Sequence, residues 1–324
     1  MSLPPLQAGW AEALLGQPVG SEPRSTCADC AMASGPAPAF RADLKCCMYL
    51  PRLPNFVVGR ILADPTAARE PVRARLADPR QRTPWGLERP ADWSAAYAQA
   101  LQDGRFGQQL DLRCPHWLDA DGGTCGIWAH REATCSTWHC RVDRGAVGKA
   151  MWTALRRWLE DVQDLVARWC VEQVGRPQTW DAAEAEAFYR ACGQQAEGLT
   201  LETIKRLGGF GLRIRSRELR ATWRERAHRA LPLRLEAGRW RVVFEDTQTV
   251  ELRSYGDYDG LTLSRGAFAA LAAFDGRPVA QVMRGLGAAA PDPDSLQAWV
   301  DHGLLQSSDP HDGLSRPAPR SQDR

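Results

Sequence analysis

The 324-residue chain lacks any long, uninterrupted apolar run. No stretch approaches the roughly 18 apolar residues that a membrane-spanning helix needs. A secretory signal has a basic start followed by about 7–15 continuous apolar residues. Here the N-terminal stretch has no Lys or Arg before residue 19, and Pro4, Pro5, Gln7 and Glu12 interrupt it. We therefore expect no membrane association and a cytoplasmic, reducing location.

Lysine is scarce, and the overall charge is small. The only lysines are Lys45, Lys149 and Lys205, and the 41 basic and 39 acidic residues give a net charge of +2. This balance indicates no general affinity for polyanions. Residues 205–241 are the exception, with one lysine and eleven arginines against three glutamates, a local charge of +9. Such a stretch can contact phosphates, but a basic run is also typical of a solvated helix face. We favour the solvated helix face and therefore do not expect a nucleic-acid partner.

Several enzyme motifs are missing. The chain has no G-x-x-x-x-G-K-[ST] phosphate loop, no H-E-x-x-H and no G-x-S-x-G. The ferredoxin run C-x2-C-x2-C-x3-C is also missing. No residue is therefore nominated as catalytic, and whether the protein is an enzyme stays open.

Cysteines, by contrast, are concentrated at one end. Eight of the ten lie within the first 140 residues: Cys27, Cys30, Cys46, Cys47, Cys114, Cys125, Cys135 and Cys140. In a reducing compartment, gathered thiolates are chiefly useful as ligands for zinc or iron–sulfur clusters. We therefore predict that these eight are the candidate metal ligands and that most of them bind metal. The remaining two, Cys170 and Cys192, fall within predicted helices and are expected to be buried core thiols.

The spacing limits how these cysteines can be shared. Cys27 and Cys30 can chelate one metal, since two intervening residues point both sulfurs inward. Cys46 and Cys47 cannot easily do so, because adjacent side chains diverge. They serve different ions, or only one of them is a ligand. Eight thiolates suit two four-thiolate sites, or one polynuclear cluster with spare cysteines.

Other residues near the cysteines have expected supporting roles. The turn at Asp121-Gly122-Gly123 is common in metal-binding loops, because glycine tolerates positive φ angles. Three tryptophans could shield a metal from water, and three histidines could replace a thiolate, although a surface or supporting role is favoured for them. They are Trp117, Trp128 and Trp138, and His116, His130 and His139.

The cysteine segment resembles a known family. The motifs are Cys114-Pro-His-Trp-Leu, Cys125-Gly-Ile-Trp and Arg131-Glu-x-x-Cys135-x-x-Trp-His-Cys140, preceded by Cys27-x2-Cys30 and Cys46-Cys47. They are similar to the zinc- or iron-chelating cysteine-cluster family, whose N-terminal signature is C-x-x-C-x-x-C-C. Here fifteen residues separate the two N-terminal pairs instead of two, and Glu132 replaces the proline expected after Arg131. One branch of that family resembles flagellin lysine methylases that carry an iron–sulfur cluster. The resemblance implies an iron–sulfur cluster, of the 4Fe–4S type, or zinc.

The C-terminal part resembles a second kind of module. Strands are predicted at 240–245, 250–253 and 261–263, and helices follow at 264–274, 279–286 and 296–302. This order is similar to the winged-helix-like peptide-recognition elements of peptide natural-product enzymes. The resemblance implies a partner peptide or protein, bound by adding a strand to a sheet edge.

The predicted fold is mainly α with irregular cysteine-rich loops and a small α+β winged-helix-like C-terminal domain. The earlier helices are predicted at 9–15, 91–101, about 147–169, 182–197 and 216–230. The expected divisions are a leader (1–26), a metal-binding domain (27–144), a helical segment packed on it (145–231), the winged-helix-like module (232–306) and a disordered tail (307–324).

We therefore predict a metal-cluster-binding protein with a partner-recognition module, with an iron–sulfur cluster favoured over zinc. Two alternatives remain open: a cluster-dependent enzyme that modifies a peptide or protein, and a regulatory nucleic-acid binder with structural zinc.

Overall fold

The computed structural model describes residues 2–34, 38–228 and 230–309, except for the side chain of Asp121. About half of these residues are helical and several small sheets hold the strands, so the fold is mainly α with some β. In this part of the chain, none of the helices combines the length and apolar character that a bilayer-spanning segment requires. Most of the predicted tail, from residue 310 onward, lies outside the described residues.

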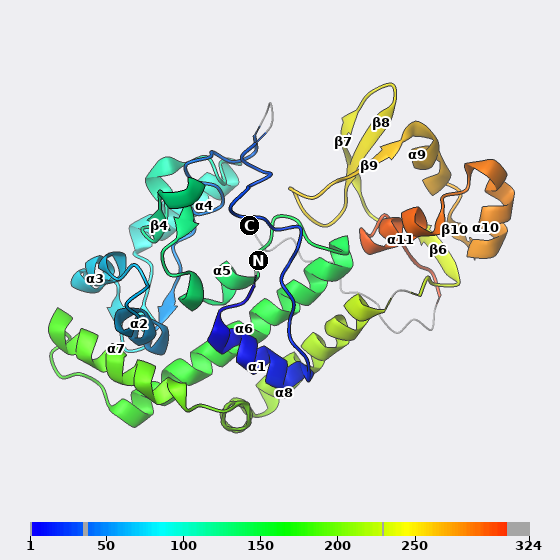
Figure 1. The fold of residues 1–324 in the computed structure, drawn as a ribbon. Helices are drawn as coiled ribbons and strands as arrows, with labels where there is room; N and C mark the ends of the chain where they lie inside the picture. The colour runs from blue at the N-terminus through cyan, green and yellow to red at the C-terminus, as the bar shows by residue number, and fades with distance from the viewer. Residues whose placement is uncertain (1, 35–37, 229, 310–324) are drawn as a thin grey trace.

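Three long helices form the scaffold. Helix α6 (Gly145–Val174) packs against both α7 (Ala182–Glu197) and α8 (Leu201–Ala227), as Figure 1 shows. The apolar side chains of α6 recur every three or four residues, so they share one face of the helix and bury it. They include Met151, Trp152, Leu155, Trp158, Leu159, Val162 and Val166. The predicted bounds of α7 are confirmed.

Helix α8 begins earlier than predicted. We expected a start at Ser216, but the helix starts at Leu201, where the Thr200 side chain caps it by accepting a hydrogen bond from the Thr203 N–H. At Gly209 the backbone leaves the helical conformation (φ 52°, ψ −137°), and the helix kinks there. The chain continues as a helix on both sides of this kink.

The N-terminal helices are short and pack on this scaffold. Helix α1 (Pro5–Leu15) buries Trp10 and Leu14 in the main core, so this part of the expected leader is packed. The others are α2 (Asn55–Ala63), α3 (Glu70–Ala77), α4 (Ala91–Gln102) and α5 (Ala133–Thr137).

Helices α2 and α7 approach each other closely at Gly59. A Cβ atom at this position would lie 1.8 Å from the carbonyl oxygen of Tyr189 and 3.0 Å from the amide nitrogen of Gly193. Both neighbours are backbone atoms, so only glycine fits without moving one helix.

Two small antiparallel sheets flank the N-terminal loops. In one, β3 (Gly86–Leu87) lies between β1 (Leu53–Pro54) and β2 (Arg82–Thr83). The other pairs β4 (Trp117–Leu118) with β5 (Thr124–Cys125). Positive φ angles at Gly122 (72°) and Gly123 (95°) form the predicted turn between β4 and β5.

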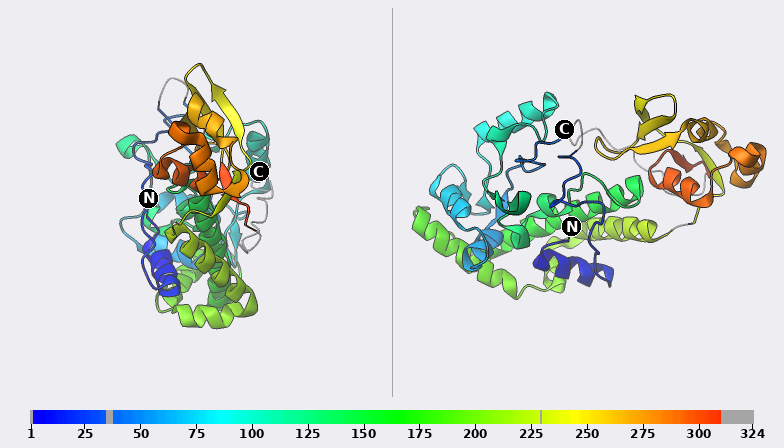
Figure 2. Two further views of the ribbon diagram at one scale, coloured as in Figure 1. Left: turned by 90° about the vertical axis from the view of Figure 1, so that its right-hand side faces the viewer. Right: turned by 45° about the horizontal axis from the view of Figure 1, so that its top comes forward.

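Residues 234–307 form a module with its own apolar core, at one end of the long helices (Figure 2). Its two antiparallel sheets run in the order β10-β6-β11 and β7-β8-β9. The strands are β6 (Arg234–Ala237), β7 (Arg241–Glu245), β8 (Thr249–Arg253), β9 (Leu261–Ser264), β10 (Asp275–Pro278) and β11 (Leu305–Ser307). Its helices are α9 (Arg265–Leu271), α10 (Val279–Leu286) and α11 (Pro293–Asp301). The bounds of α10 are as predicted. Ser264 caps α9 by accepting a hydrogen bond from the Ala267 N–H.

The module is tied to the scaffold by a buried ion pair. The Arg144 guanidinium donates two hydrogen bonds to Asp301, at 2.9 and 2.6 Å. Both side chains are nearly buried, and Asp301 raises the pKa of Arg144. Arg144 also donates to the carbonyl oxygen of His228, just beyond the end of α8. One residue therefore joins α8 and α11 at the start of α6.

Candidate metal centre

The fold brings the cysteines of residues 27–47 close to those of residues 114–140. The Cys114 N–H donates a hydrogen bond of 2.7 Å to the Cys47 carbonyl oxygen, joining segments 67 residues apart. Strand pairing of β4 with β5 then places Cys125 opposite Trp117. Cys135 lies in α5, where its N–H donates to the capping carboxylate of Glu132. In Figure 1 these segments lie on one side of α6.

Four thiols influence one another's pKa values, and we treat them as a first group: Cys27, Cys30, Cys46 and Cys140. Burial raises the pKa of Cys27 to about 11, and the charges of Cys47, Cys140 and Cys30 raise it further. Burial and then Cys30 raise the pKa of Cys140. The pKa of Cys46 is raised well above its ordinary value, first by a hydrogen bond with Cys47 and by burial, and also by Cys27 and Cys140.

A second group contains Cys47, Cys114, Cys125 and Cys135. Burial raises the pKa of Cys114 to about 12, and Cys47 and Cys125 contribute. The pKa of Cys125 rises to about 11, again through burial first, with Cys47 and also Cys27 of the first group among its charged neighbours. Burial raises the pKa of Cys135 well above its ordinary value, and Cys114 and Cys125 add to the shift.

The two groups meet at Cys46 and Cys47, whose side chains hydrogen bond to each other. That bond lowers the pKa of Cys47 despite its burial, and Lys45 and Arg131 lower it further. All ten cysteines are thiols, with no disulfide among the described residues. Within the same residues, no three His, Cys, Asp or Glu side chains are arranged closely enough to hold a metal ion. The described residues therefore hold no ready-made metal site, although the thiols influence one another's pKa values.

Buried basic side chains lie among the thiols. The Lys45 ammonium donates to the carbonyl oxygens of Cys27 (2.6 Å) and Gly123 (3.1 Å), and Lys45 is only 5% exposed. The φ angle of Lys45 is 51°, in the left-handed region that non-glycine residues rarely adopt. Such strain clusters at functional sites.

Arg131 is the second buried cation. Its guanidinium carbon lies 3.7 Å from the centre of the Trp128 ring, and it donates to the carbonyl oxygens of Ser2 and Cys135. Burial lowers its pKa, while the neighbouring thiols oppose that shift: Cys125, Cys135, Cys27 and Cys47. Arg131 therefore faces members of both thiol groups.

Arg75 is the third. It is buried and donates to Gln81 and to the carbonyl oxygens of Leu87 and Glu88. Burial lowers its pKa to about 10, and Cys114 is the first neighbour that opposes the shift. Burying a cation is costly unless an opposite charge compensates it, so these three positions suit an anionic centre.

The three histidines differ in their surroundings. His130 contacts the Asp64 carboxylate at 2.8 Å, away from the thiols. His116 is buried beside Arg75, and its Nδ1 atom has no hydrogen-bond partner among the described residues. His139 is buried against Trp152, and in the described structure both of its ring nitrogens lack partners. Burial lowers the pKa of His116 to about 3 and that of His139 to about 2. Both are neutral imidazoles beside cysteine ligand candidates.

A residue that the sequence did not nominate reaches the thiols from the C-terminal module. Tyr258, in the β8–β9 loop, packs its ring against those of Phe40, Phe106 and Trp138. Burial raises the pKa of Tyr258 to about 12, and Cys46 and Cys140 are among the charges that contribute. The loop has no periodic apolar pattern, so no local sequence signal identifies this contact.

The neighbouring Asp259 holds that loop in place. Its side chain is 1% exposed and accepts two hydrogen bonds from Arg24, at 2.9 and 3.1 Å. It also accepts a hydrogen bond from the Val142 N–H. The loop is therefore fixed to segments on either side of the cysteine-rich region.

Cys170 and Cys192 are separate from this cluster. Both are fully buried in the main apolar core, as predicted, and the Cys170 thiol donates to the Cys192 carbonyl oxygen. Compared with family models, curated proteins and solved structures, the chain gives no significant match.

Proposed function

We propose that the eight clustered cysteines bind metal as thiolates in two four-thiolate sites. The first site would use Cys27, Cys30, Cys46 and Cys140, and the second would use Cys47, Cys114, Cys125 and Cys135. This division assigns the adjacent Cys46 and Cys47 to different sites, because two neighbouring residues cannot easily chelate one ion together. Metal binding would then separate the two side chains, which hydrogen bond to each other in the described structure.

The observation that carries the proposal is the burial of Lys45, Arg131 and Arg75 beside these thiols. Neutral thiols add no negative charge beside these side chains, whereas thiolates bound to metal do. The aromatic side chains around Tyr258 support the proposal, since an apolar surround limits solvent access to a metal site.

Metal binding must draw the thiols closer together and remove their protons. Six of the thiols have raised pKa values and are protonated at neutral pH without metal, so binding releases protons and weakens in acid. They are Cys27, Cys46, Cys114, Cys125, Cys135 and Cys140. Only a reducing compartment such as the cytoplasm would keep all eight cysteines available.

We favour iron–sulfur clusters over zinc, because the motifs from Cys114 to Cys140 resemble a family with an iron–sulfur branch. The experiment is anaerobic purification followed by metal and sulfide analysis and a visible absorption spectrum. Iron with acid-labile sulfide and a broad visible absorption supports this form. A colourless protein with about two zinc ions per chain supports structural zinc instead. Less than about half a metal ion per chain would refute metal binding altogether.

Single substitutions test the division into two sites. Cys30→Ser and Cys135→Ser should each remove about half of the bound metal, because each affects one site. Cys170→Ser, in the apolar core, should leave the metal content unchanged. Complete loss of metal in both site variants would indicate one shared polynuclear centre and overturn the division.

A second candidate function is recognition of an extended peptide by the C-terminal module. Strand β7 is an edge of its sheet, and its Val242 and Phe244 side chains are exposed at alternate positions. An edge strand with apolar side chains of this kind suits strand addition. Tyr258, which lies near the thiols, is in the loop between β8 and β9 of the same sheet. A peptide bound at β7 would therefore lie on a sheet that is connected to the proposed metal centre.

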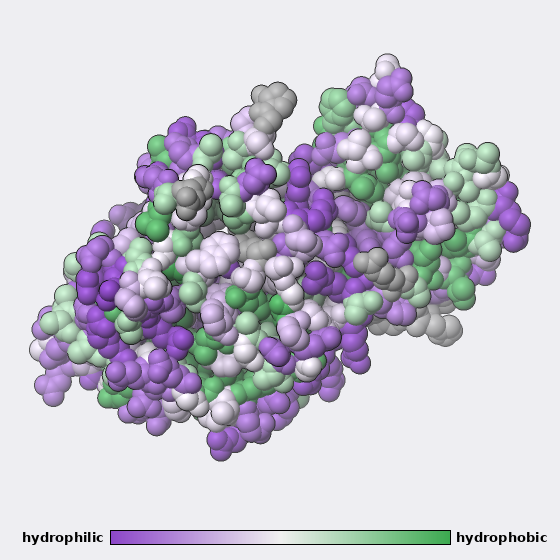
Figure 3. Space-filling model, viewed as in Figure 1, coloured by the Kyte–Doolittle hydropathy of each residue, from purple (hydrophilic) through white to green (hydrophobic). Residues whose placement is uncertain are grey.

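Selection from a library of displayed peptides tests this function. Peptides selected on the wild-type protein should lose binding to the Phe244→Asp variant and keep binding to Leu233→Asp. Leu233 is 80% exposed and directly precedes β6, outside the edge of β7. Figure 3 shows that the module carries hydrophobic as well as hydrophilic residues on its surface. Equal loss in both variants would contradict binding at the edge of β7.

A visible spectrum that changes when peptide or S-adenosylmethionine is added would favour a cluster-dependent enzyme.

A further inference from the structure

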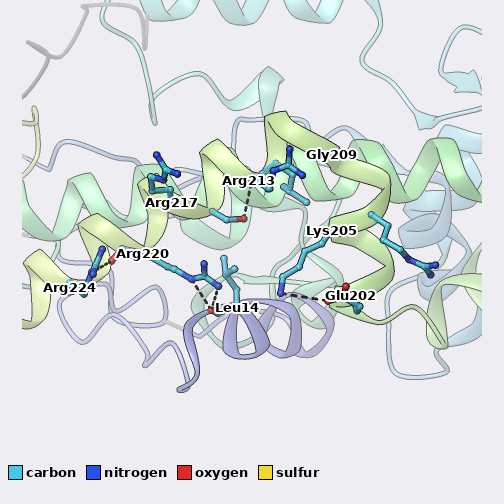
Figure 4. Close-up of a pocket in the computed structure, with 11 residues that line it drawn as sticks. Leu14, Glu202, Lys205, Gly209, Arg213, Arg217, Arg220 and Arg224 are labelled. Atoms are coloured by element: carbon cyan, nitrogen blue, oxygen red, sulfur yellow. Dashed lines mark hydrogen bonds and ion pairs between the residues drawn. The ribbon is translucent and has the colours of Figure 1, made fainter.

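A basic groove runs along α8 on the scaffold, outside the proposed metal centre. Its volume is about 670 Å³, and its far wall includes Leu14 at the end of α1 (Figure 4). Six basic side chains and one acidic side chain, Glu202, line it, which gives a net charge of +5. The basic residues are Lys205, Arg206, Arg213, Arg217, Arg220 and Arg224. The whole chain carries only +2, so this groove concentrates positive charge.

The arginines of the groove differ from others on the same helix. Arg215, on another face of α8, pairs with Asp161 at 3.2 Å and with Glu218 at 3.3 Å. Among the described residues, none of the five groove arginines forms an ion pair with a carboxylate. Arg220 donates instead to the Leu14 carbonyl oxygen, and Arg206 donates to the Thr203 hydroxyl. Within the groove, the only acid is Glu202, 3.9 Å from Lys205.

The arginines form a row. Arg213, Arg217, Arg220 and Arg224 follow one another at spacings of four, three and four residues, which places them along one helix face. With a rise of about 1.5 Å per residue, the row is about 16 Å long. The kink at Gly209 changes the direction of α8. As a result, Lys205 and Arg206, which precede the kink, line the same groove as the arginines (Figure 4). A row of this length suits an extended polyanion rather than a single phosphate.

Apolar side chains lie beside the row. Phe210 is 70% exposed, and the Arg213 guanidinium lies 5.7 Å from the centre of its ring. Ile214 is half exposed on the next turn. Proteins that bind single strands combine a basic groove that follows the backbone with aromatic rings on which bases stack. An acidic peptide would pair with the basic side chains but would make no stacking contact with the exposed Phe210 ring.

An anionic membrane fits this surface less well. A helix that lies on a bilayer presents one continuous apolar face, whereas α8 is kinked and its most apolar face is buried against α6. We propose that the α8 groove binds the phosphate backbone of a single-stranded nucleic acid, with Phe210 stacking on a base. This revises the sequence-based preference for a solvated helix face, because the arginines that line the groove lack acidic partners.

Fluorescence anisotropy with the full-length protein tests this proposal. The probes are labelled 12-nucleotide oligo-dT and oligo-U strands, titrated over a range of salt concentrations. The test variant is Arg213→Gln/Arg217→Gln. The matched control is Arg277→Gln/Arg284→Gln, which removes two exposed charges from the C-terminal module. Circular dichroism spectra of all variants check folding.

The wild-type and control proteins should bind with the same salt dependence. The test variant should bind at least tenfold more weakly, and its slope of log K against log salt should be smaller by about 1.4, since each phosphate contact on a single strand contributes about 0.7. Phe210→Ala should weaken oligonucleotide binding several-fold without changing that slope. Preference for one probe would identify the natural strand as RNA or DNA.

Three results would overturn the proposal. They are no binding of either strand at low salt, equal loss in the test and control variants, and binding of polyglutamate or anionic vesicles with no binding of oligonucleotides. None of these measurements depends on metal, so failure here leaves the proposed metal centre standing, and failure of the metal centre leaves this groove standing.

Discussion

At the scale of single residues, the buried charge of Lys45 is most closely connected to the proposed centre. Lys45→Met keeps the length of the side chain and removes both its charge and its hydrogen bonds to the carbonyl oxygens of Cys27 and Gly123. We expect this variant to bind metal more weakly, because a buried anionic site loses a compensating cation.

Metal retention during titration with a chelator measures the effect. The Arg41→Met variant is the control, since Arg41 is an exposed side chain paired with Asp43. Equal retention in the Lys45→Met and wild-type proteins would show that the buried lysine has no electrostatic part in metal binding.

His302 predicts a dependence of stability on pH. It is nearly buried at the junction of the module, and burial lowers its pKa below the ordinary value of about 6.5. As the pH falls through that value, the unfolded chain takes up the proton first, so the folded state loses stability in acid. Urea unfolding at pH 7.5 and 5.5 should therefore show a smaller acid-induced loss in His302→Gln than in wild type. An unchanged loss would mean that other groups control the acid response.

At the scale of elements, the contact between α2 and α7 depends on Gly59. The Gly59→Ala methyl would overlap the Tyr189 carbonyl oxygen, so the helices must separate. We expect a loss of roughly 1–3 kcal/mol in the free energy of unfolding. Gly9→Ala in α1 is the matched control, because no atom lies within 4 Å of its added Cβ. It should stabilise the protein by about 0.5–1 kcal/mol through helix propensity. Chemical denaturation that shows equal changes in both variants would contradict the close approach.

Elements with strong local signals could be predicted from the sequence. Helix α7 has its capping Asp181 and its apolar residues at helical spacing, and its bounds were correct. Helix α8 was predicted too short, because Gly208 and Gly209 suggest a break locally, whereas packing against α6 holds the helix on both sides of the kink.

The candidate site could be predicted only in part. Spacing indicated that Cys46 and Cys47 serve different ions or that only one of them is a ligand, but it could not show which other cysteines lie near each of them. That depends on long-range contacts, such as the hydrogen bond from Cys114 to Cys47. The positions of Lys45, Arg131 and Tyr258 among the thiols depend on tertiary packing in the same way.

At the scale of the whole molecule, the C-terminal module is held by the Arg144–Asp301 pair. Asp301→Ala leaves Arg144 buried without its carboxylate partner, which typically costs about 3–5 kcal/mol. We expect the module to separate from the scaffold more readily, with faster proteolysis between α8 and β6. Asp275→Ala is the control, since its pair with Arg277 is exposed and contributes little. Cleavage at equal rates in both variants would show that other contacts hold the module.

The hydrogen bond between Cys114 and Cys47 has a consequence for the unfolded chain. Metal bound to both residues would close a loop of 67 residues, which contains α2, α3 and α4. By the entropy of loop closure, such a cross-link lowers the freedom of the unfolded chain by an amount equivalent to roughly 4 kcal/mol at 25 °C. The bound metal would then be a cross-link within the N-terminal half of the chain. Its removal would destabilise α2, α3 and α4, although these helices contribute no ligand.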